Sequence, residues 1–160
     1  MEKELRVGIG CDSHPLVSGR RLILGGVDIP YDKGLSGWSD ADVATHAIID
    51  ALCGAADLGD IGTLFSSQEP EYKDISSLVL LSKTGELLKA KGFKVVNIDV
   101  TIIAQNPKLS PFVAEMRKRL SKVLGVESTQ VTIKATTTNG LGFIGRGEGM
   151  AAQAVALIQK

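Results

Sequence analysis

The sequence predicts an α+β fold: a two-layer sandwich in which a mixed sheet of four or five strands carries helices mainly on one face. Strand-like and helix-like segments follow one another in the order β, β, α, α, β, α, β, β, which is not a strict βα repeat. Residues 96–102 alternate apolar and polar side chains, as expected for a strand with one buried face. The length of 160 residues fits one domain, which we place at 1–160.

The composition limits the possible partners and location. Hydrophobic residues make up 44% of the chain but aromatic residues only 4%, so we expect a core of aliphatic side chains. Lys plus Arg and Asp plus Glu are both 18, which argues against a nucleic-acid partner bound through a basic surface. The chain has no apolar run of about 18 residues, and residues 1–6 are charged rather than signal-like. We therefore expect a cytoplasmic protein without membrane contact.

The first half of the chain contains two strand segments and a well-marked helix. Residues 6–12 and 22–27 have strand character, and a glycine-rich polar loop follows them. Ser39 and Asp42 have the spacing of a capping box, which predicts a helix start. Apolar residues then recur at helical spacing as far as Gly59, so this helix is the clearest element of the sequence.

The second half adds two helices and three strands. Asp74 is placed to cap a helix that Gly92 ends. Ser110 and Pro111 mark another helix entry, with proline in the first turn. The remaining segments in chain order are a strand at 96–102, a helix at 110–124, a strand at 130–137, a glycine-rich connection at 140–147 and a last strand at 149–158.

Two histidines and an aspartate form the main candidate site. Asp12 and His14 lie two residues apart at the end of a strand, so their side chains share one face. His46 lies on the flank of the helix opposite its apolar stripe, together with Asp42 and Asp50. If the helix packs beside the strand end, the two histidines and Asp12 converge. Such a set suits Zn²⁺ and leaves one coordination position open, which is typical of catalytic zinc.

The spacing also allows a purely structural interpretation. In it, His14 is a loop residue and His46 is a surface histidine held by Asp42 or Asp50. Because one D-x-H pattern with a remote histidine is a weak signal, spacing alone leaves both interpretations open. Cys53 is too far along the helix to join His46 on one ion, and we expect it to be reduced and structural, as we do Cys11.

Seven segments match one known family, in order and over nearly the whole chain: 6–14, 24–27, 39–46, 58–62, 99–105, 134–138 and 142–149. In these segments the chain resembles the 2-C-methyl-D-erythritol 2,4-cyclodiphosphate synthase family of the non-mevalonate isoprenoid pathway. The resemblance implies metal-dependent cyclisation of 4-diphosphocytidyl-2-C-methyl-D-erythritol 2-phosphate with release of CMP, a phosphorus–oxygen lyase reaction.

The resemblance also implies two metal ions. Zn²⁺ would be bound by Asp12, His14 and His46. A second ion, Mg²⁺ or Mn²⁺, would lie between the substrate phosphates, where this chain has Asn139 in place of the family's usual carboxylate. A neutral amide attracts a divalent cation less than a carboxylate does, so the second ion would rely more on substrate oxygens.

Three catalytic positions follow from the same resemblance. Thr137 would support the transition state, and Ser39 and Trp38 would lie beside the phosphates. Trp38 replaces the family's usual histidine, so a group that can carry charge becomes an indole with a single N–H. The flexible loop at 65–70 keeps the ends of the family pattern but not its aspartates.

The substrate-binding residues implied by the resemblance belong to two segments of the chain and one strand end. Structural roles stay open for several of them, such as a plain turn at Gly62 and a helix cap at Ser110. The residues are Asp60, Ile61, Gly62, Phe65, Ala104, Pro107, Lys108, Leu109, Ser110, Thr136 and Thr137.

Finally, the resemblance implies a homotrimer with active sites between subunits. Phe143 and Arg146 would line a central cavity that takes an isoprenoid diphosphate, although Arg146 could equally belong to a turn at a subunit interface. Two other functions remain open. One is a trimer of low activity that binds isoprenoid diphosphates, and the other is a zinc-dependent phosphohydrolase in which water attacks.

Overall fold

The computed structural model describes residues 3–160, so Met1 and Glu2 of the charged N-terminal stretch lie outside the described residues. The strands are β1 (Leu5–Ser18), β2 (Leu22–Leu24), β3 (Val27–Ile29), β4 (Lys33–Leu35), β5 (Lys94–Ile103), β6 (Val131–Thr136) and β7 (Gly149–Gln159). The helices are α1 (Val43–Ala55), α2 (Ile61–Leu64), α3 (Ser77–Ala90), α4 (Val113–Leu124) and α5 (Gly142–Gly145), with 3₁₀ turns at Pro70–Tyr72, Ser110–Phe112 and Ser128–Gln130. Between residues 3 and 160, no helix has both the length and the apolar character needed to cross a bilayer.

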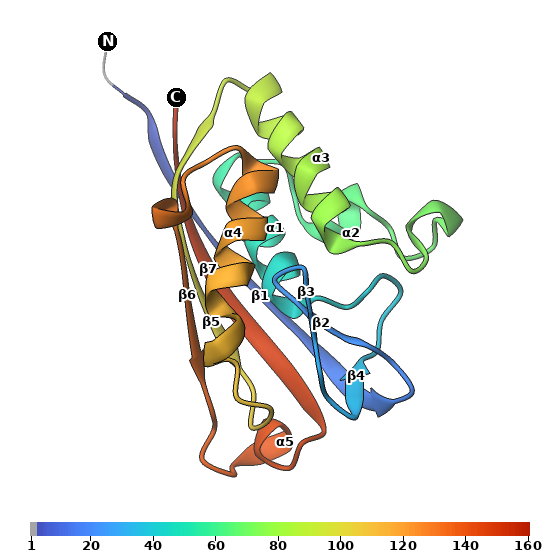
Figure 1. Ribbon diagram of the computed structural model, residues 1–160. Coiled ribbons are helices and arrows are strands. Elements are labelled where there is room, and N and C mark those ends of the chain that lie inside the picture. The colour runs from blue at the N-terminus through green and yellow to red at the C-terminus, as the bar shows by residue number, and fades with distance from the viewer. Residues whose placement is uncertain (1–2) are drawn as a thin grey trace.

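The predicted α+β architecture is confirmed. The strands β4-β1-β7-β5-β6 form one five-stranded sheet, and the long helices α1, α3 and α4 cover one of its faces (Figure 1). β7 pairs antiparallel with both β1 and β5, whereas β5 and β6 run parallel, so the sheet is mixed. β2 and β3 form a separate antiparallel pair.

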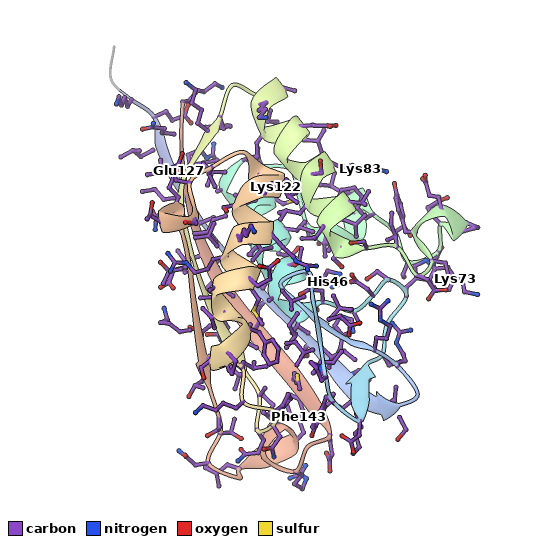
Figure 2. All side chains as sticks on the ribbon, in the orientation of Figure 1. His46, Lys73, Lys83, Lys122, Glu127 and Phe143 are labelled. Carbon is purple, nitrogen blue, oxygen red and sulfur yellow. The ribbon has the colours of Figure 1, made fainter. Side chains whose placement is uncertain are left out.

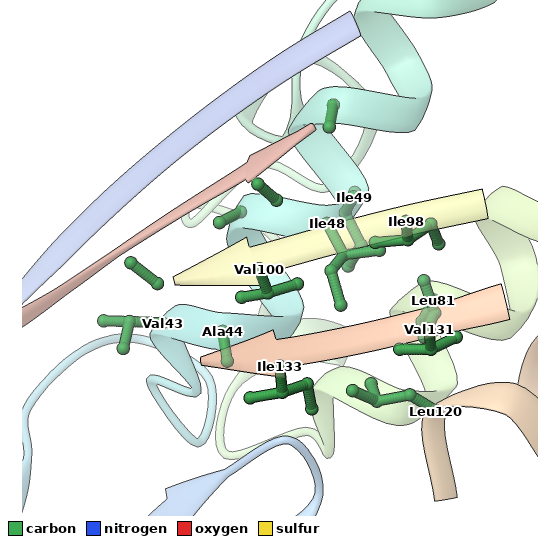
Figure 3. Packing of buried hydrophobic residues seen from close by; sticks show 14 of the residues in the cluster. Val43, Ala44, Ile48, Ile49, Leu81, Ile98, Val100, Leu120, Val131 and Ile133 are labelled. Atoms are coloured by element: carbon green, nitrogen blue, oxygen red, sulfur yellow. The ribbon is translucent and has the colours of Figure 1, made fainter. Parts of the chain in front are cut away.

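The core lies between this sheet and the helices and is aliphatic, as the composition predicts. Figure 3 shows side chains of α1, β5 and β6 packed together, with Leu81 from α3 and Leu120 from α4 against them. On β7 every second side chain is buried, as a strand with one covered face requires. Several of these buried β7 residues are alanines, including Ala152, Ala154 and Ala156, so the helices can approach the sheet closely.

Helix α1 makes direct backbone contact with strand β1. A Cβ atom added to Gly10 would lie 1.9 Å from the carbonyl oxygen of Ala47, and one added to Gly8 would lie 1.9 Å from that of Ala51. A distance of 1.9 Å is far below van der Waals contact, so only glycine fits at these two positions. The contact brings the helix residue beside Ala47, which is His46, next to the strand.

The opposite face of the sheet is uncovered in the single chain. Val7 is 68% exposed and Ile9 is 73% exposed, and Val155 of the adjacent strand β7 is also exposed. Cys11 continues this exposed row, whereas Cys53 is buried. Both are free thiols, in line with the expectation that they are reduced. The protein therefore presents an apolar strip along β1 and β7.

Two boundaries of the first half differ from the prediction. β1 continues beyond residue 12, because its pairing with β7 runs as far as Pro15, and Asp12 and His14 therefore lie within the strand rather than at its end. The N-cap of α1 is Asp42, whose side chain accepts the N–H of Thr45, so the predicted capping box at Ser39 is wrong. Two capping residues only three positions apart left the sequence pattern ambiguous.

In the second half, the start of α3 also differs. Its N-cap is Ser76, whose hydroxyl accepts the N–H of Leu78, and not Asp74. Asp74 has a φ of 57°, a left-handed conformation that does not lead into a helix. At the other end, Gly92 follows the C-cap of α3 with positive φ, and Gly125 ends α4 in the left-handed conformation, as predicted.

The close contact between α1 and β1 predicts that Gly10→Ala loses about 3 kcal/mol of folding stability, because the added methyl group overlaps helix backbone. Gly54→Ala is the matched control: Gly54 is an exposed position of α1 with no atom within 4 Å of an added Cβ. This control is expected to gain about 0.5–1 kcal/mol. Denaturant titrations measure both changes, and equal stability of Gly10→Ala and wild type would contradict the contact.

Candidate metal centre

The structure brings Asp12, His14 and His46 together. Their candidate ligand atoms all lie within 4.8 Å of one another. Asp12 Oδ2 is 2.9 Å from His14 Nε2 and 3.0 Å from His46 Nδ1. Asp12 and His14 project from β1, and His46, which is labelled near the middle of the molecule in Figure 2, projects from α1. The convergence predicted from the sequence is therefore confirmed.

The surroundings of His14 fit a metal ion. Its Nδ1–H donates to the carbonyl oxygen of Ser36 at 2.9 Å, so Nε2 carries the lone pair in the neutral ring. Nε2 is buried and faces Asp12 without hydrogen-bond geometry, and it has no hydrogen-bond partner among the described residues. A buried lone pair directed at a carboxylate oxygen is the arrangement that a divalent cation resolves.

His46 is buried, with 8% of its surface exposed. Its Nε2 lies 2.7 Å from the hydroxyl of Ser77 and 3.1 Å from that of Ser39, and its Nδ1 faces Asp12. Each ring nitrogen of His46 therefore has a polar neighbour: serine hydroxyls beside Nε2 and the Asp12 carboxylate beside Nδ1. Ser77 has no role in the sequence prediction, because no local pattern shows that the start of α3 reaches α1.

The alternative in which Asp42 or Asp50 holds His46 is wrong. The fully buried Asp42 carboxylate accepts the N–H groups of the Gly25-Gly26 turn and both the N–H and the hydroxyl of Thr45. Asp50 accepts the backbone N–H of Ile61. Asp42 thus fixes the start of α1 and the turn beside it, which sets the position of His46 one turn further along the helix.

The triad is electrostatically coupled. Burial disfavours the charged form of Asp12, but its close contacts with His14 and His46 and the positive charge of these imidazoles outweigh the burial and lower the pKa of this carboxyl to about 2. Burial also opposes the charged form of His14, and the facing carboxylate outweighs it and raises the pKa of the imidazole. Asp12 is therefore a carboxylate at neutral pH, the form in which it can bind a metal.

The triad opens into a pocket that contains five more of the predicted site residues. These are Trp38, Ser39, Ile61, Gly62 and Phe65. The rest of the pocket wall comes from Ser66, Ser67 and Gln68 of the loop at 65–70, and from Tyr72 and Leu80, for which the sequence predicts no role. Asp60 caps the adjacent helix α2 through hydrogen bonds from the N–H and hydroxyl of Thr63, which lower the pKa of the Asp60 carboxyl.

Trp38 connects this pocket to the loop between α2 and α3. Its indole N–H donates to the carbonyl oxygen of Glu69 at 3.1 Å, and the ammonium group of Lys73 lies 5.9 Å from the ring centroid. An indole has one hydrogen-bond donor, and here the loop uses it. Trp38 therefore fastens this loop beside the pocket.

The other predicted substrate residues line a second pocket, at the ends of β5 and β6. The predicted residues there are Ala104, Pro107, Lys108, Leu109, Ser110, Thr136 and Thr137. The two pockets share no lining residue in the described chain. One chain therefore holds the predicted substrate residues in two separate groups.

The remaining predicted residues lie near α5. Asn139 is exposed with a φ of 54°, a conformation that asparagine tolerates better than glutamate, and its N–H donates to the hydroxyl of Thr137. Phe143, labelled beside α5 in Figure 2, lines a third pocket together with His14. Arg146 pairs with Glu148, its Nε lying 2.8 Å from the carboxylate.

The fold and the triad define an α+β protein with a candidate metal centre of two histidines and one carboxylate, open to a pocket. Comparison with known families agrees with this description. The model of the YgbB family matches residues 5–159, and the chain belongs to that family.

Curated relatives carry one name. The 2-C-methyl-D-erythritol 2,4-cyclodiphosphate synthase of Pelotomaculum thermopropionicum is 57% identical over 156 residues, which cover 98% of this chain and 96% of the relative. That of Caldicellulosiruptor bescii is 58% identical over 153 residues, 96% of this chain and 98% of the relative.

Solved structures share the fold. IspF of Plasmodium falciparum in complex with CDP is 32% identical, with a TM-score of 0.86 and coverage of 99% of this chain and 97% of that one. The bifunctional IspDF of Campylobacter jejuni is 39% identical with a TM-score of 0.95, and the match covers 99% of this chain but 43% of that longer chain.

The buried carboxylate of Asp42 predicts that Asp42→Ala lowers the free energy of unfolding by about 3 kcal/mol or more, because several N–H groups lose their acceptor. Asp28→Ala serves as the control, since it removes an exposed ion pair with Arg21 and should cost less than about 1 kcal/mol. Urea titration distinguishes the two variants. Similar small losses in both would show that Asp42 does not anchor α1.

Proposed function

We propose that this chain catalyses the cyclisation of 4-diphosphocytidyl-2-C-methyl-D-erythritol 2-phosphate to 2-C-methyl-D-erythritol 2,4-cyclodiphosphate. An oxygen of the 2-phosphate attacks the β-phosphorus, the bond from that phosphorus to the α-phosphate oxygen breaks, and CMP leaves, so the reaction is a phosphorus–oxygen lyase reaction. The observation that carries the proposal is the pocket-facing triad of Asp12, His14 and His46 in a chain more than half identical to synthases of this name.

The attacking group is already an anion, so the protein needs no strong base. It must overcome repulsion between phosphates and align them. Zn²⁺ on Asp12, His14 and His46 would supply a Lewis acid, and Mg²⁺ or Mn²⁺ between the α- and β-phosphates would stabilise the leaving group. We place that second ion beside Asn139, with most of its ligands from the substrate.

Side chains near the triad suit phosphate alignment. The hydroxyl of Ser39 accepts the N–H of Ala41, which leaves its own proton free to donate to a phosphate oxygen. Trp38 acts indirectly in this proposal, because its N–H holds the loop at Glu69. Thr137 supports the transition state from the second pocket.

The cytidine part of the substrate fits the two groups of predicted residues. We assign the ribose to Asp60, Ile61 and Gly62, with Phe65 beside them, and we assign the base and diphosphate to the second pocket, whose predicted members are Ala104, Pro107, Lys108, Leu109, Ser110 and Thr136. Complexes of structural relatives with CDP support a nucleotide ligand of this kind.

A homotrimer would unite the two groups. The pockets are separate within one chain, and an apolar strip that includes Val7, Ile9 and Val155 lies exposed on the sheet. Phe143 and Arg146 would then face a central cavity for an isoprenoid diphosphate, which must compete with Glu148 for Arg146. The proposal includes a single cyclodiphosphate-synthase-like domain at 1–160 and a cytosolic location.

Removal of a triad ligand is expected to abolish CMP release and to deplete bound zinc, because a three-ligand site has no spare ligand. Asp12→Ala, His14→Ala and His46→Ala test this, with elemental analysis of metal and mass analysis of product. Full zinc content and a wild-type rate in His46→Ala would refute the centre. A hydrolysed, uncyclised product from wild type would favour the phosphohydrolase, and ligand binding without CMP release would favour the low-activity trimer.

For assembly, wild type should scatter light as a trimer. Ile9→Lys should dissociate it and abolish turnover, because a charge would be buried in the apolar strip. Val79→Lys is the control, since Val79 is an exposed apolar residue of α3 on the helical side and should leave both properties unchanged. A fully active wild-type monomer at assay concentration would disprove the trimer.

A further inference from the structure

Ser77 and Asp40 are connected to each other and to His46 by hydrogen bonds. Ser77 is the first residue of α3 and is fully buried, and its hydroxyl lies 2.7 Å from His46 Nε2. The same hydroxyl donates a hydrogen bond to Asp40 Oδ1. Neither residue lines the pocket that contains the triad. Among the triad residues, the hydroxyl of Ser77 contacts His46.

The direction of these hydrogen bonds follows from the donors around Asp40. Its carboxylate also accepts the N–H of Ser77 at 3.0 Å and the N–H of Asp42 at 3.2 Å. A carboxylate only accepts, so the hydroxyl proton of Ser77 is donated to Asp40. The oxygen of Ser77 is then free to accept a proton from His46 Nε2. Asp12 Oδ2, 3.0 Å from His46 Nδ1, competes for that proton when no metal ion is bound to Nδ1.

Ser39 does not take over this role. Its hydroxyl lies farther from His46 Nε2, at 3.1 Å, and already accepts the N–H of Ala41. A neutral imidazole has one N–H, and Ser77 offers the shorter contact to it, on an oxygen whose own proton is directed elsewhere. Ser77 is therefore the acceptor that holds the proton of His46 on Nε2 when a metal ion is bound to Nδ1.

We propose that Ser77 and Asp40 are positioning residues that keep the proton of His46 on Nε2 and so present the Nδ1 lone pair to the metal centre. The inference deepens the proposed function and rests on its metal site. His14 is arranged in the opposite sense, because Ser36 holds its proton on Nδ1 and leaves Nε2 for the metal. The two histidines thus offer different ring nitrogens, each selected by an acceptor on the far side of the ring.

The proton positions are directly measurable in the wild-type protein. The chain has two histidines, so nitrogen–proton correlation spectra of the zinc-loaded protein contain two imidazole patterns, which through-bond correlations to the backbone signals of His14 and His46 assign. We expect the zinc-bound nitrogen to be Nε2 in His14 and Nδ1 in His46. A proton on Nδ1 of His46 with Nε2 bound to zinc would overturn the inference, whatever the variants do.

Zinc affinity tests the contribution of the hydrogen bonds that Ser77 and Asp40 make. Ser77→Ala and Asp40→Asn should each weaken zinc binding by about 10- to 100-fold, measured by competition with a chromophoric chelator, because the imidazole loses its orienting partner. Ser76→Ala is the matched control: it removes the neighbouring hydroxyl, which caps α3 at Leu78 and does not touch His46. Its affinity should equal that of wild type within about twofold.

The outcomes separate this inference from the proposed function. Equal zinc affinity in Ser77→Ala and wild type would overturn the positioning role and leave the zinc centre intact. An equal loss in Ser76→Ala would also overturn it, since disturbance of the start of α3 would then explain the effect. Wild-type protein that binds no zinc would overturn the metal centre itself, and the inference with it.

Discussion

The backbone contact between α1 and β1 is the constraint on which the rest of the structure depends. Because Gly8 and Gly10 have no side chains, the helix lies directly on the strand. His46 of the helix therefore comes beside Asp12 and His14 of the strand. Asp12 and His14 alone would be a surface pair on a strand. The contact adds His46 and buries it, and the core alanines of β7 keep the helix layer close along the rest of the sheet.

Much of this arrangement could be predicted from the sequence because it depends on local periodicity. The two-residue repeat of a strand puts Asp12 and His14 on one face, and the helical repeat puts His46 opposite the apolar stripe of α1. What the pattern could not supply is the distance between strand and helix. That distance depends on glycines whose importance appears only when the opposing backbone is known, so spacing alone left a structural role for His46 open.

The surroundings of the site were harder to predict from the sequence, for physical reasons that differ from residue to residue. Ser39 and Asp42 are both good capping residues, and the choice of Asp42 rests on the Gly25-Gly26 turn, which is distant in sequence. Ser77 reaches His46 only through the packing of α3 on α1. The separation of the predicted substrate residues into two pockets is likewise a tertiary fact that motif order does not contain.

The indole of Trp38 also has an energetic consequence. Its N–H joins Trp38 to the carbonyl oxygen of Glu69, so two parts of the pocket wall that lie 31 positions apart in the chain are tied together. Movement of the loop away from the pocket would have to break this hydrogen bond, which typically contributes about 0.5–1.5 kcal/mol. A single aromatic side chain outside the metal triad thereby adds to the free-energy cost of opening the pocket.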